Sequence, residues 1–377
     1  DMFYVSSAAS GGESSKTANE GLRTNNVQTL TYFDTFGNHN VTAMLGHEYY
    51  NAKTKYLYAH AKGMFSPEIQ EIGAAATKDD SDSYSTEYNV EGYFLSAQYD
   101  YANRYYASVS FRRDATSYFA PENRWGNFWS VGAAWIISKE SFMQNAGWID
   151  QLKLKASIGQ QGNDDIGSYN YVDLYSLSKA TDTSMSAAFY RKGNPNITWE
   201  TTTNFNAGLE LSLWGGRLSG SLDVYNKKTS DLLFWTSIPE SSGSRGMYDN
   251  IGDIRNYGVE LSLNATLVRT RLVDWSVFGN ISHNKTKILT LPPSKILTGG
   301  FSESANGYVT YYYREGGELN NYYAPCYAGV DDLGQAMFYV DVVTTDENGN
   351  EVVIEKGDKT YDFNAATKYE HGSILPK

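Results

Sequence analysis

Residues that could do acid–base, nucleophilic or metal chemistry are present in this chain, but they are not grouped. The five histidines lie far apart and show no metal-ligand spacing; they are His39, His47, His60, His283 and His371. The sequence contains no Gly-x-Ser-x-Gly nucleophile elbow and no Walker-type phosphate loop. We therefore expect no catalytic residue, no metal site and no cofactor.

Two pairs of adjacent acids, Asp164–Asp165 and Asp331–Asp332, could contribute oxygen ligands to a calcium ion. Both pairs lie in polar segments, so we interpret them as solvated loop acids. Whether loop acids bind calcium is left open by the sequence.

Aromatic side chains are the residues that could bind a ligand. Tyrosine alone accounts for 31 of the 377 residues. Sugars stack on aromatic faces, and Asp or Asn side chains can hydrogen-bond their hydroxyl groups. The candidate substrate-binding residues, all in segments that we expect to be loops, are Tyr118, Phe119, Trp125, Tyr171, Tyr175, Trp235, Tyr311, Tyr312 and Tyr313. The alternative is that these rings pack loop against loop.

The elements that would position these rings are strands, because most of the chain alternates with a period of two residues. Between Tyr93 and Tyr101, apolar or aromatic residues at odd positions alternate with mostly polar residues at even positions. The same pattern recurs in residues 105–112, 152–158, 204–213, 217–224, 259–267 and 274–282. The sequence therefore predicts an all-β chain with about ten to twelve strands, each with one apolar and one polar face.

Strand length separates a membrane barrel from a soluble sandwich. The segment from Asn204 to Trp214 would be about 36 Å long, and tilted by about 40° it would rise roughly 28 Å. That rise is close to the apolar band of about 25 Å in outer-membrane barrels, whereas sandwich strands average about five or six residues. A spanning helix is not expected, since the densest apolar stretch, Val131–Ile137, is far shorter than the ~18 residues required.

The connections between these strands are of two lengths. Short ones lie at residues 37–40, 102–103, 215–216 and 270–272, and long ones at about 51–91, 114–126, 161–199, 231–253 and 292–377. Residues 138–150 are intermediate and could hold a short helical turn. Short turns on one side and long loops on the other are typical of a transmembrane antiparallel β-barrel. We expect residues 1–377 to be part of one such barrel domain, with the long loops extracellular.

The polar and aromatic residues fit this arrangement. Tryptophans near strand ends would form interfacial girdles; they are Trp129, Trp135, Trp148, Trp214 and Trp275. Charged side chains of the polar face would line a lumen; they are Arg112, Lys153, Lys155, Glu210, Arg217, Asp223 and Glu260. The net charge of −12 argues against a nucleic-acid partner, which usually needs a basic face.

Four segments resemble signatures of the SusC/RagA family of TonB-dependent outer-membrane transporters. They are Gly159–Tyr169 after a Lys-Leu-rich strand, the GNPNITWE segment at Gly193–Glu200, the YNKKTSDLL segment at Tyr225–Leu233, and Asn250–Leu261. Asn, Gly and Asp in these motifs suit tight turns and side-chain-to-backbone hydrogen bonds, so we interpret the motifs as structural.

The resemblance implies a barrel of about 22 strands that is closed by a plug domain. It implies active import of glycans or oligopeptides through the outer membrane of a Gram-negative bacterium of Bacteroides type. The implied partners are the TonB complex, membrane lipid and a SusD-type surface lipoprotein, which the loop aromatics could contact instead of substrate. We find no plug, no TonB box and too few strands for a full barrel, so we expect this chain to be a partial barrel.

Two alternatives remain open. The chain could belong to a passive porin or a surface adhesin, which a full-length gene without a plug would favour. An outer-membrane enzyme is disfavoured, because the chain lacks a nucleophile–base pair.

Overall fold

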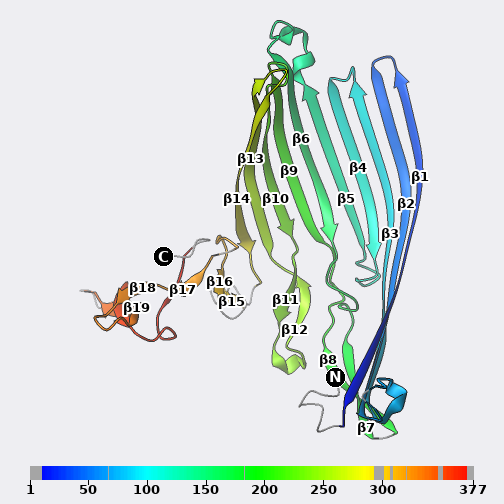
Figure 1. Ribbon diagram of the computed structural model, residues 1–377, viewed down its shortest axis with the longest axis vertical. Helices are drawn as coiled ribbons and strands as arrows, with labels where there is room; N and C mark the ends of the chain where they lie inside the picture. Colours follow the sequence, from blue (N-terminus) through cyan, green and yellow to red (C-terminus); the bar gives the residue numbers. More distant parts are fainter. Residues whose placement is uncertain are drawn as a thin grey trace. The chain divides into compact units, whose positions relative to one another are not determined.

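The computed structural model describes residues 11–66, 68–181, 183–292, 301–305, 309–319, 321–346 and 351–371. Within these ranges the chain is almost wholly β, with a few short 3-10 turns (Figure 1). None of the helical turns in the described ranges is long and apolar enough to cross a membrane. The chain divides into two compact units, one of residues 1–133, 162–199 and 238–248, the other of residues 134–161, 200–237 and 249–377.

The first unit is built on long antiparallel strands in sequence order. They are β1 (Glu13–Phe36), β2 (His39–Met64), β3 (Ala75–Tyr101), β4 (Tyr105–Thr116) and most of β5 (Trp125–Ile136). A separate hairpin, β7 (Leu174–Thr181) and β8 (Ser184–Arg191), also belongs to this unit. The 3-10 turns η1 (Ile72–Ala74) and η4 (Glu240–Ser242) complete it.

The second unit contains the remaining long strands, in the order β6 (Ile149–Asn163), β9 (Glu200–Leu213), β10 (Leu218–Ser230), β13 (Asp253–Arg269) and β14 (Asp274–Thr290). The 3-10 turns η2 (Ile137–Lys139) and η3 (Ser141–Met143) precede β6, which confirms the expected helical turn in this connection. Further strands follow β10 and β14; they are β11 (Leu233–Ser237), β12 (Gly246–Asn250), β15 (Phe301–Ala305), β16 (Val309–Tyr313), β17 (Tyr323–Pro325), β18 (Tyr327–Val330), β19 (Ala336–Thr345), β20 (Glu351–Thr360) and β21 (Lys368–Glu370). Strand β12 begins in the first unit, whose last segment ends at residue 248.

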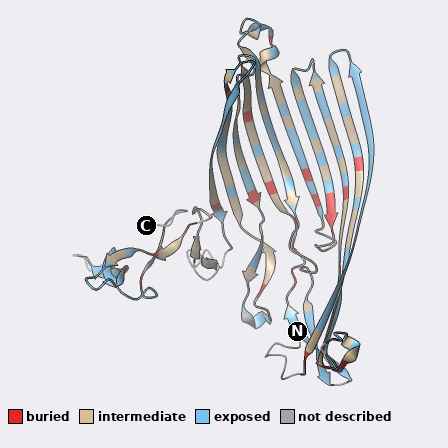
Figure 2. Cartoon of the chain, in the orientation of Figure 1, coloured by how far each residue is buried: buried red, intermediate tan, exposed pale blue. Residues whose placement is uncertain are grey.

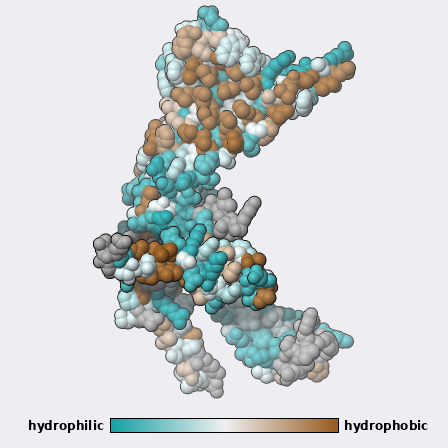
Figure 3. Space-filling view, turned by 90° about the vertical axis from the view of Figure 1, so that its left-hand side faces the viewer, coloured by the Kyte–Doolittle hydropathy of each residue, from teal (hydrophilic) through white to brown (hydrophobic). Residues whose placement is uncertain are grey.

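Strand register confirms the two-faced alternation. In the first unit Leu95 pairs with Leu45 and Phe111, and in the second Leu222 pairs with Leu209 and Leu261. These apolar side chains lie on one face and remain about half exposed: 49% for Leu95 and 43% for Leu222. Figure 3 shows such side chains gathered in a brown band near the short-turn end of the long strands. Exposed apolar area of this extent needs a non-aqueous neighbour.

The buried core is correspondingly small. Figure 2 shows only scattered buried residues along the strands. Among the described residues, the largest fully buried side chains are Phe119, Ile197 and Thr116, all from the first unit near the ends of β4 and β9. A second small cluster in the first unit joins Ala61, Met64 and Ala75, with Ile72 packed against it.

The short turns lie where the sequence predicted them. The turn between β3 and β4 has Ala102 and Asn103 at φ 54° and 52°, as a type I′ hairpin turn requires. Gly37 and the pair Gly215–Gly216 supply positive φ at two other turns.

The expected long loop at residues 51–91 is wrong as a description of secondary structure. Strand β2 continues to Met64 and β3 begins at Ala75, so the chain reverses only within residues 65–74. These strand halves have polar residues on both faces, and so they lack the apolar period from which strands are recognised. Backbone hydrogen bonding between neighbouring strands maintains them without an apolar face.

The other predicted loops also contain regular structure. Strand β4 runs to Thr116 and β5 begins at Trp125, which shortens the 114–126 connection to residues 117–124. The 161–199 segment holds the β7–β8 hairpin, the 231–253 segment holds β11 and β12, and seven short strands lie within 292–377. Parts of that last segment, including residues 293–300 and 372–377, lie outside the described residues. That all of these segments belong to one barrel domain stays a prediction.

Candidate ligand-binding face

Five tyrosines share one face of the first unit, beyond the apolar band. We call Tyr50, Tyr56, Tyr84, Tyr88 and Tyr118 the tyrosine stripe. Tyr56 on β2 pairs directly with Tyr84 on β3. All four strand residues have even numbers, which puts them on the polar face that Ser96 and Gln98 continue toward the short turns.

The rings of the tyrosine stripe contact one another. Tyr56 and Tyr84 are stacked, with centroids 4.8 Å apart and an interplanar angle of 23°. The Tyr88 ring lies edge-on to Tyr50, with centroids 5.9 Å apart, and is tilted against Tyr118, with centroids 4.4 Å apart. Cross-strand aromatic pairs of this kind stabilise a sheet, and they also hold the rings in fixed positions.

An acid fixes the middle of the stripe. The Tyr88 hydroxyl donates a hydrogen bond of 3.0 Å to Asp164. Burial raises the pKa of Tyr88 well above its usual range, and the negative charge of Asp164 adds to the shift. Burial likewise raises the pKa of Tyr118. Both phenols therefore stay protonated at neutral pH, and Asp164 serves as an acceptor for Tyr88.

An ion-pair cluster lies on the same face, nearer the apolar band. Arg112 donates to Glu48 at 2.7 Å and to Asp114 at 2.7 Å. A Cβ on Gly92 would overlap the side-chain ends of both Arg112 and Asp114, so a larger residue would force the ion-paired cluster to shift. Arg112 thus pairs with two carboxylates, which holds the three side chains in place and leaves the cluster with a formal charge of −1.

The second unit carries a comparable network on its polar face. Lys155 lies 2.9 Å from Glu210 and 3.0 Å from Asp223, and Lys153 lies 3.2 Å from Glu210. A Cβ on Gly208 would overlap Asp223 and Lys155. These charged residues, predicted to line a lumen, therefore lie together on the polar face.

A buried aromatic cluster anchors the connections next to the stripe. Phe119 and Phe128 contact Trp199 edge-on, at 5.6 Å and 5.2 Å, and the Trp199 indole N–H donates to the Arg124 carbonyl at 2.9 Å. Phe119 has no exposed surface. Trp199 belongs to the Gly193–Glu200 segment, so the geometry agrees with a structural interpretation of that motif.

Two of the segments that carry the family resemblance contact each other in the second unit. Lys228 forms an ion pair of 2.9 Å with Asp253, and the Asn250 amide donates to the Asp231 carbonyl at 3.0 Å. These contacts join the Tyr225–Leu233 and Asn250–Leu261 segments where β10 ends and β13 begins.

The predicted aromatic residues of the first unit have different surroundings. Tyr118 is part of the tyrosine stripe, whereas the buried Phe119 offers no surface to a ligand. Trp125 opens β5 on the opposite, apolar face, where Arg113 lies 5.1 Å from its ring. That position suits an interfacial girdle better than a ligand site. Tyr171 is half-buried, and the exposed Tyr175 packs edge-on against Phe189 of its own hairpin.

The predicted aromatic residues of the second unit pack mainly on neighbouring segments. Tyr311 stacks on Tyr322 at 5.4 Å and Tyr312 on Tyr323 at 4.8 Å, which is the loop-against-loop packing of the alternative interpretation. Trp235 lies on β11 with 40% of its surface exposed.

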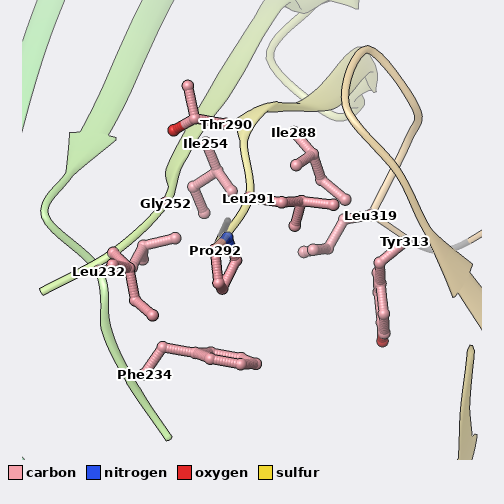
Figure 4. Close-up of a pocket in the computed structure, with 11 residues that line it drawn as sticks. Leu232, Phe234, Gly252, Ile254, Ile288, Thr290, Leu291, Pro292, Tyr313 and Leu319 are labelled. Atoms are coloured by element: carbon pink, nitrogen blue, oxygen red, sulfur yellow. The ribbon is translucent and has the colours of Figure 1, made fainter. Parts of the chain in front are cut away.

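Tyr313 borders a small apolar pocket of ≈ 190 Å³ (Figure 4). The rest of the lining comes from the ends of β10, β13 and β14 and from nearby connections; it includes Leu232, Phe234, Ile251, Ile254, Ile288, Leu291, Pro292 and Leu319. The lining is almost entirely hydrocarbon, and the space suits one apolar side chain.

Tyr50, Tyr56, Tyr84 and Tyr88 of the tyrosine stripe were not among the sequence candidates, although three of them lie in the predicted 51–91 loop. A signal was present: Tyr56 and Tyr58 are two residues apart, and Tyr84, Thr86, Tyr88 and Val90 continue the same spacing. Tyrosine at every second or fourth position is typical of a strand in water that presents rings on one face.

The acid pairs have roles in local structure. Asp331 accepts backbone N–H bonds from Leu333 at 2.9 Å and from Gln335 at 2.8 Å, which lowers the pKa of its carboxyl group. Asp164 accepts from Tyr88. Within the described ranges, no group of three or more His, Cys, Asp or Glu side chains is placed to hold a metal ion.

Comparison with known proteins gives consistent matches. The family model of TonB dependent receptor-like, beta-barrel proteins matches residues 2–370. TonB-dependent receptor P3 of Formosa agariphila is 32% identical over 336 residues, which cover 86% of this chain and 33% of that protein. TonB-dependent receptor SusC of Bacteroides thetaiotaomicron is 32% identical over 280 residues, covering 72% of this chain and 27% of that protein.

A solved structure extends the match to the fold. The structure of the RagAB peptide transporter superposes with a TM-score of 0.82 and 27% identity, over 96% of this chain and 39% of that chain. The present chain thus spans about a third of the length of the curated relatives it matches. The two-faced strands, the short turns and these matches confirm the SusC/RagA-type resemblance, and the chain belongs to the TonB-dependent receptor-like β-barrel family, as part of a transmembrane antiparallel barrel.

Proposed function

We propose that the complete protein actively imports glycans or oligopeptides across the outer membrane of a Bacteroides-type bacterium. The names of the relatives support this proposal, since one is the receptor SusC and another is a RagAB peptide importer. The TonB complex would supply the energy, and a SusD-type surface lipoprotein would cap the barrel. No enzymatic step is included.

The observation that carries the proposal is the difference between the two faces of the strands, of which one is apolar and the other polar. The apolar face carries half-exposed leucines such as Leu95 and Leu222, which suit lipid contact. The polar face carries paired charges near the band and the tyrosine stripe beyond it. A solute passing along this face would meet aromatic rings first and fixed, paired charges afterwards.

The experiment is a deletion of the full-length gene in its host, followed by growth on a panel of polysaccharides and protein digests as sole nutrient. Loss of growth on one nutrient, restored by the intact gene, is the expected result. A second strain should carry the gene without its TonB-contacting segment. This strain should fail like the deletion, whereas unimpaired growth would indicate passive entry. Growth of the deletion strain on every nutrient would contradict the proposal.

A further inference from the structure

The tyrosine stripe lies well outside the apolar band. On β3 the outermost ring of the apolar face is Tyr93, which stacks near Trp125 at 6.3 Å in a girdle arrangement. Tyr88 is five residues and Tyr84 nine residues farther along the strand, or roughly 16 Å and 30 Å at ~3.3 Å per residue. These rings therefore lie outside the apolar band and do not contribute to membrane anchoring.

The stripe is not part of a hydrophobic core. Tyr84 keeps 55% of its surface exposed. Between the Tyr56–Tyr84 pair and Tyr88, the same face carries only small side chains in one cross-strand row: Gly21, Thr54 and Thr86. A Cβ added to Gly21 would meet no atom within 4 Å, so the row is open. Two aromatic positions are thus separated by an open polar step on the order of 13 Å along the strand.

The polar groups beside the rings include the hydroxyls of Thr54 and Thr86 and the carboxylate of Asp164. On β1 the facing residues in register are Asn19, Gly21 and Arg23. The Tyr88 phenol is held by Asp164 and stays protonated, which leaves its ring oriented. Rings with amide, hydroxyl and guanidinium groups beside them match the alternating apolar and hydroxyl surfaces of a sugar chain.

Charge selects among the possible sugar chains. Beside the stripe, Asp82 pairs with Tyr58 and Asp164 accepts from Tyr88, so two carboxylates outnumber the guanidinium group of Arg23 and the local charge is negative. A sulfated or uronate-rich polymer would be repelled by such a field, whereas a neutral one would not. We propose that the tyrosine stripe is a docking platform for a neutral oligosaccharide, outside the membrane and ahead of the barrel lumen. This inference rests on the proposed import function and specifies its substrate class.

The ring positions are set before any ligand arrives. Tyr56 and Tyr84 are fixed by their mutual stacking, and Tyr88 by Tyr50, Tyr118 and Asp164. A platform assembled in this way loses little conformational entropy on binding. Aromatic residues at protein interfaces also contribute a large share of binding energy per residue.

The test uses the purified full-length protein in detergent, together with its lipoprotein where one co-purifies. Calorimetric titration with a panel of neutral oligosaccharides of glucose, mannose, galactose and xylose should find at least one that binds. The double variant Tyr56→Ala/Tyr84→Ala should weaken that binding about tenfold or more. The matched control is Leu57→Ala/Ser83→Ala, the adjacent cross-strand pair on the opposite face, which should change it less than about twofold. Unchanged heat-modifiable migration on a gel would show that each variant is folded.

Several outcomes would overturn the inference. One is that no neutral oligosaccharide binds, and another is that the two double variants weaken binding equally. A third is that an oligopeptide mixture or a sulfated polysaccharide binds more tightly than any neutral oligosaccharide, and that this binding depends on Tyr56 and Tyr84. Growth assays separate this failure from failure of the proposed function. If gene deletion abolishes growth on a nutrient while the Tyr56→Ala/Tyr84→Ala strain grows normally at low concentration, the platform is refuted and import stands. If deletion has no effect on any nutrient, the import proposal fails instead.

Discussion

Replacing Leu222 by arginine should destabilise the barrel, whereas the same change at Ser221 should not. Leu222 is 43% exposed on the apolar face and pairs with Leu209 and Leu261. It lies four residues after the start of β10, about 13 Å along the strand and roughly 10 Å in depth for a tilt of ~40°. That depth is close to the middle of an apolar band of about 25 Å.

The expected magnitude follows from this position. An arginine near the bilayer midplane costs about 2–4 kcal/mol of folding free energy. Ser221 is the neighbouring residue on the polar face and pairs with Glu210, so an arginine there meets water and an acid. We expect Ser221→Arg to change the free energy of unfolding by less than about 1 kcal/mol.

The assay is urea-induced unfolding of the full-length protein in lipid vesicles, followed by heat-modifiable gel migration. The difference between the two variants should lie near 2–4 kcal/mol, with Leu222→Arg the less stable. Equal losses would refute the assignment of faces, and a larger loss for Ser221→Arg would reverse it.

Three further changes test other contacts. Gly92→Ala should lower the free energy of unfolding by about 1–3 kcal/mol, because its Cβ would overlap the ion-paired cluster. Gly21→Ala meets open space, so it should be neutral or slightly stabilising. Unfolding in vesicles compares the two variants, and equal effects would contradict the structure. Trp199→Ala removes a buried ring from the aromatic cluster and should lower the local stability by about 3–5 kcal/mol. Trypsin should then cleave faster within residues 164–198, and an unchanged cleavage rate would argue against an anchoring role. The difference between ultraviolet titrations of the protein and its Tyr88→Phe variant should place the Tyr88 pKa above the ordinary value of 10.0, chiefly because the ring is buried. Asp164→Asn should lower this pKa because a neighbouring negative charge is removed, and an unchanged pKa would argue against a contact with Asp164.

The membrane-facing part of the fold was predictable because the order of apolar and polar residues within each strand specifies it. One face of each strand must be apolar and the other polar, so residues such as Leu209 and Leu222 fall on a strict two-residue period. Turn positions were predictable for the same reason, since Gly215 and Asn103 adopt positive φ that few residues tolerate.

The outer halves of β2 and β3 could not be predicted in this way. Water contacts both of their faces, so nothing requires an apolar period between Asn51 and Glu91. Their strand character depends on hydrogen bonding to a neighbour, which is a property of the sheet and not of the segment. The loop interpretation of this region therefore failed, and the sequence did not show that Tyr56, Tyr84 and Tyr88 share one face of a sheet.

The candidate site was predictable only as a class of residue. Aromatic enrichment indicated ring-based binding, but the environment of each ring depends on long-range contacts. Phe119 is enclosed by Trp199, which is 80 positions away in the chain, and Tyr88 reaches Asp164. Phe119 and Tyr118 are adjacent in sequence, yet Phe119 is fully buried and Tyr118 is half-buried in the tyrosine stripe. Such a difference can be obtained only from the folded structure.

Spin labelling along β10 would examine the lipid assignment itself. Single cysteines at positions 218 to 224, with Cys326 replaced by serine, would each carry a nitroxide in the vesicle-embedded protein. Oxygen collisions should dominate at the even positions and collisions with a water-soluble nickel chelate at the odd ones, giving a two-residue oscillation. Even positions shielded from both reagents, in a protein that remains soluble without detergent, would instead mean that these side chains are packed inside a sandwich.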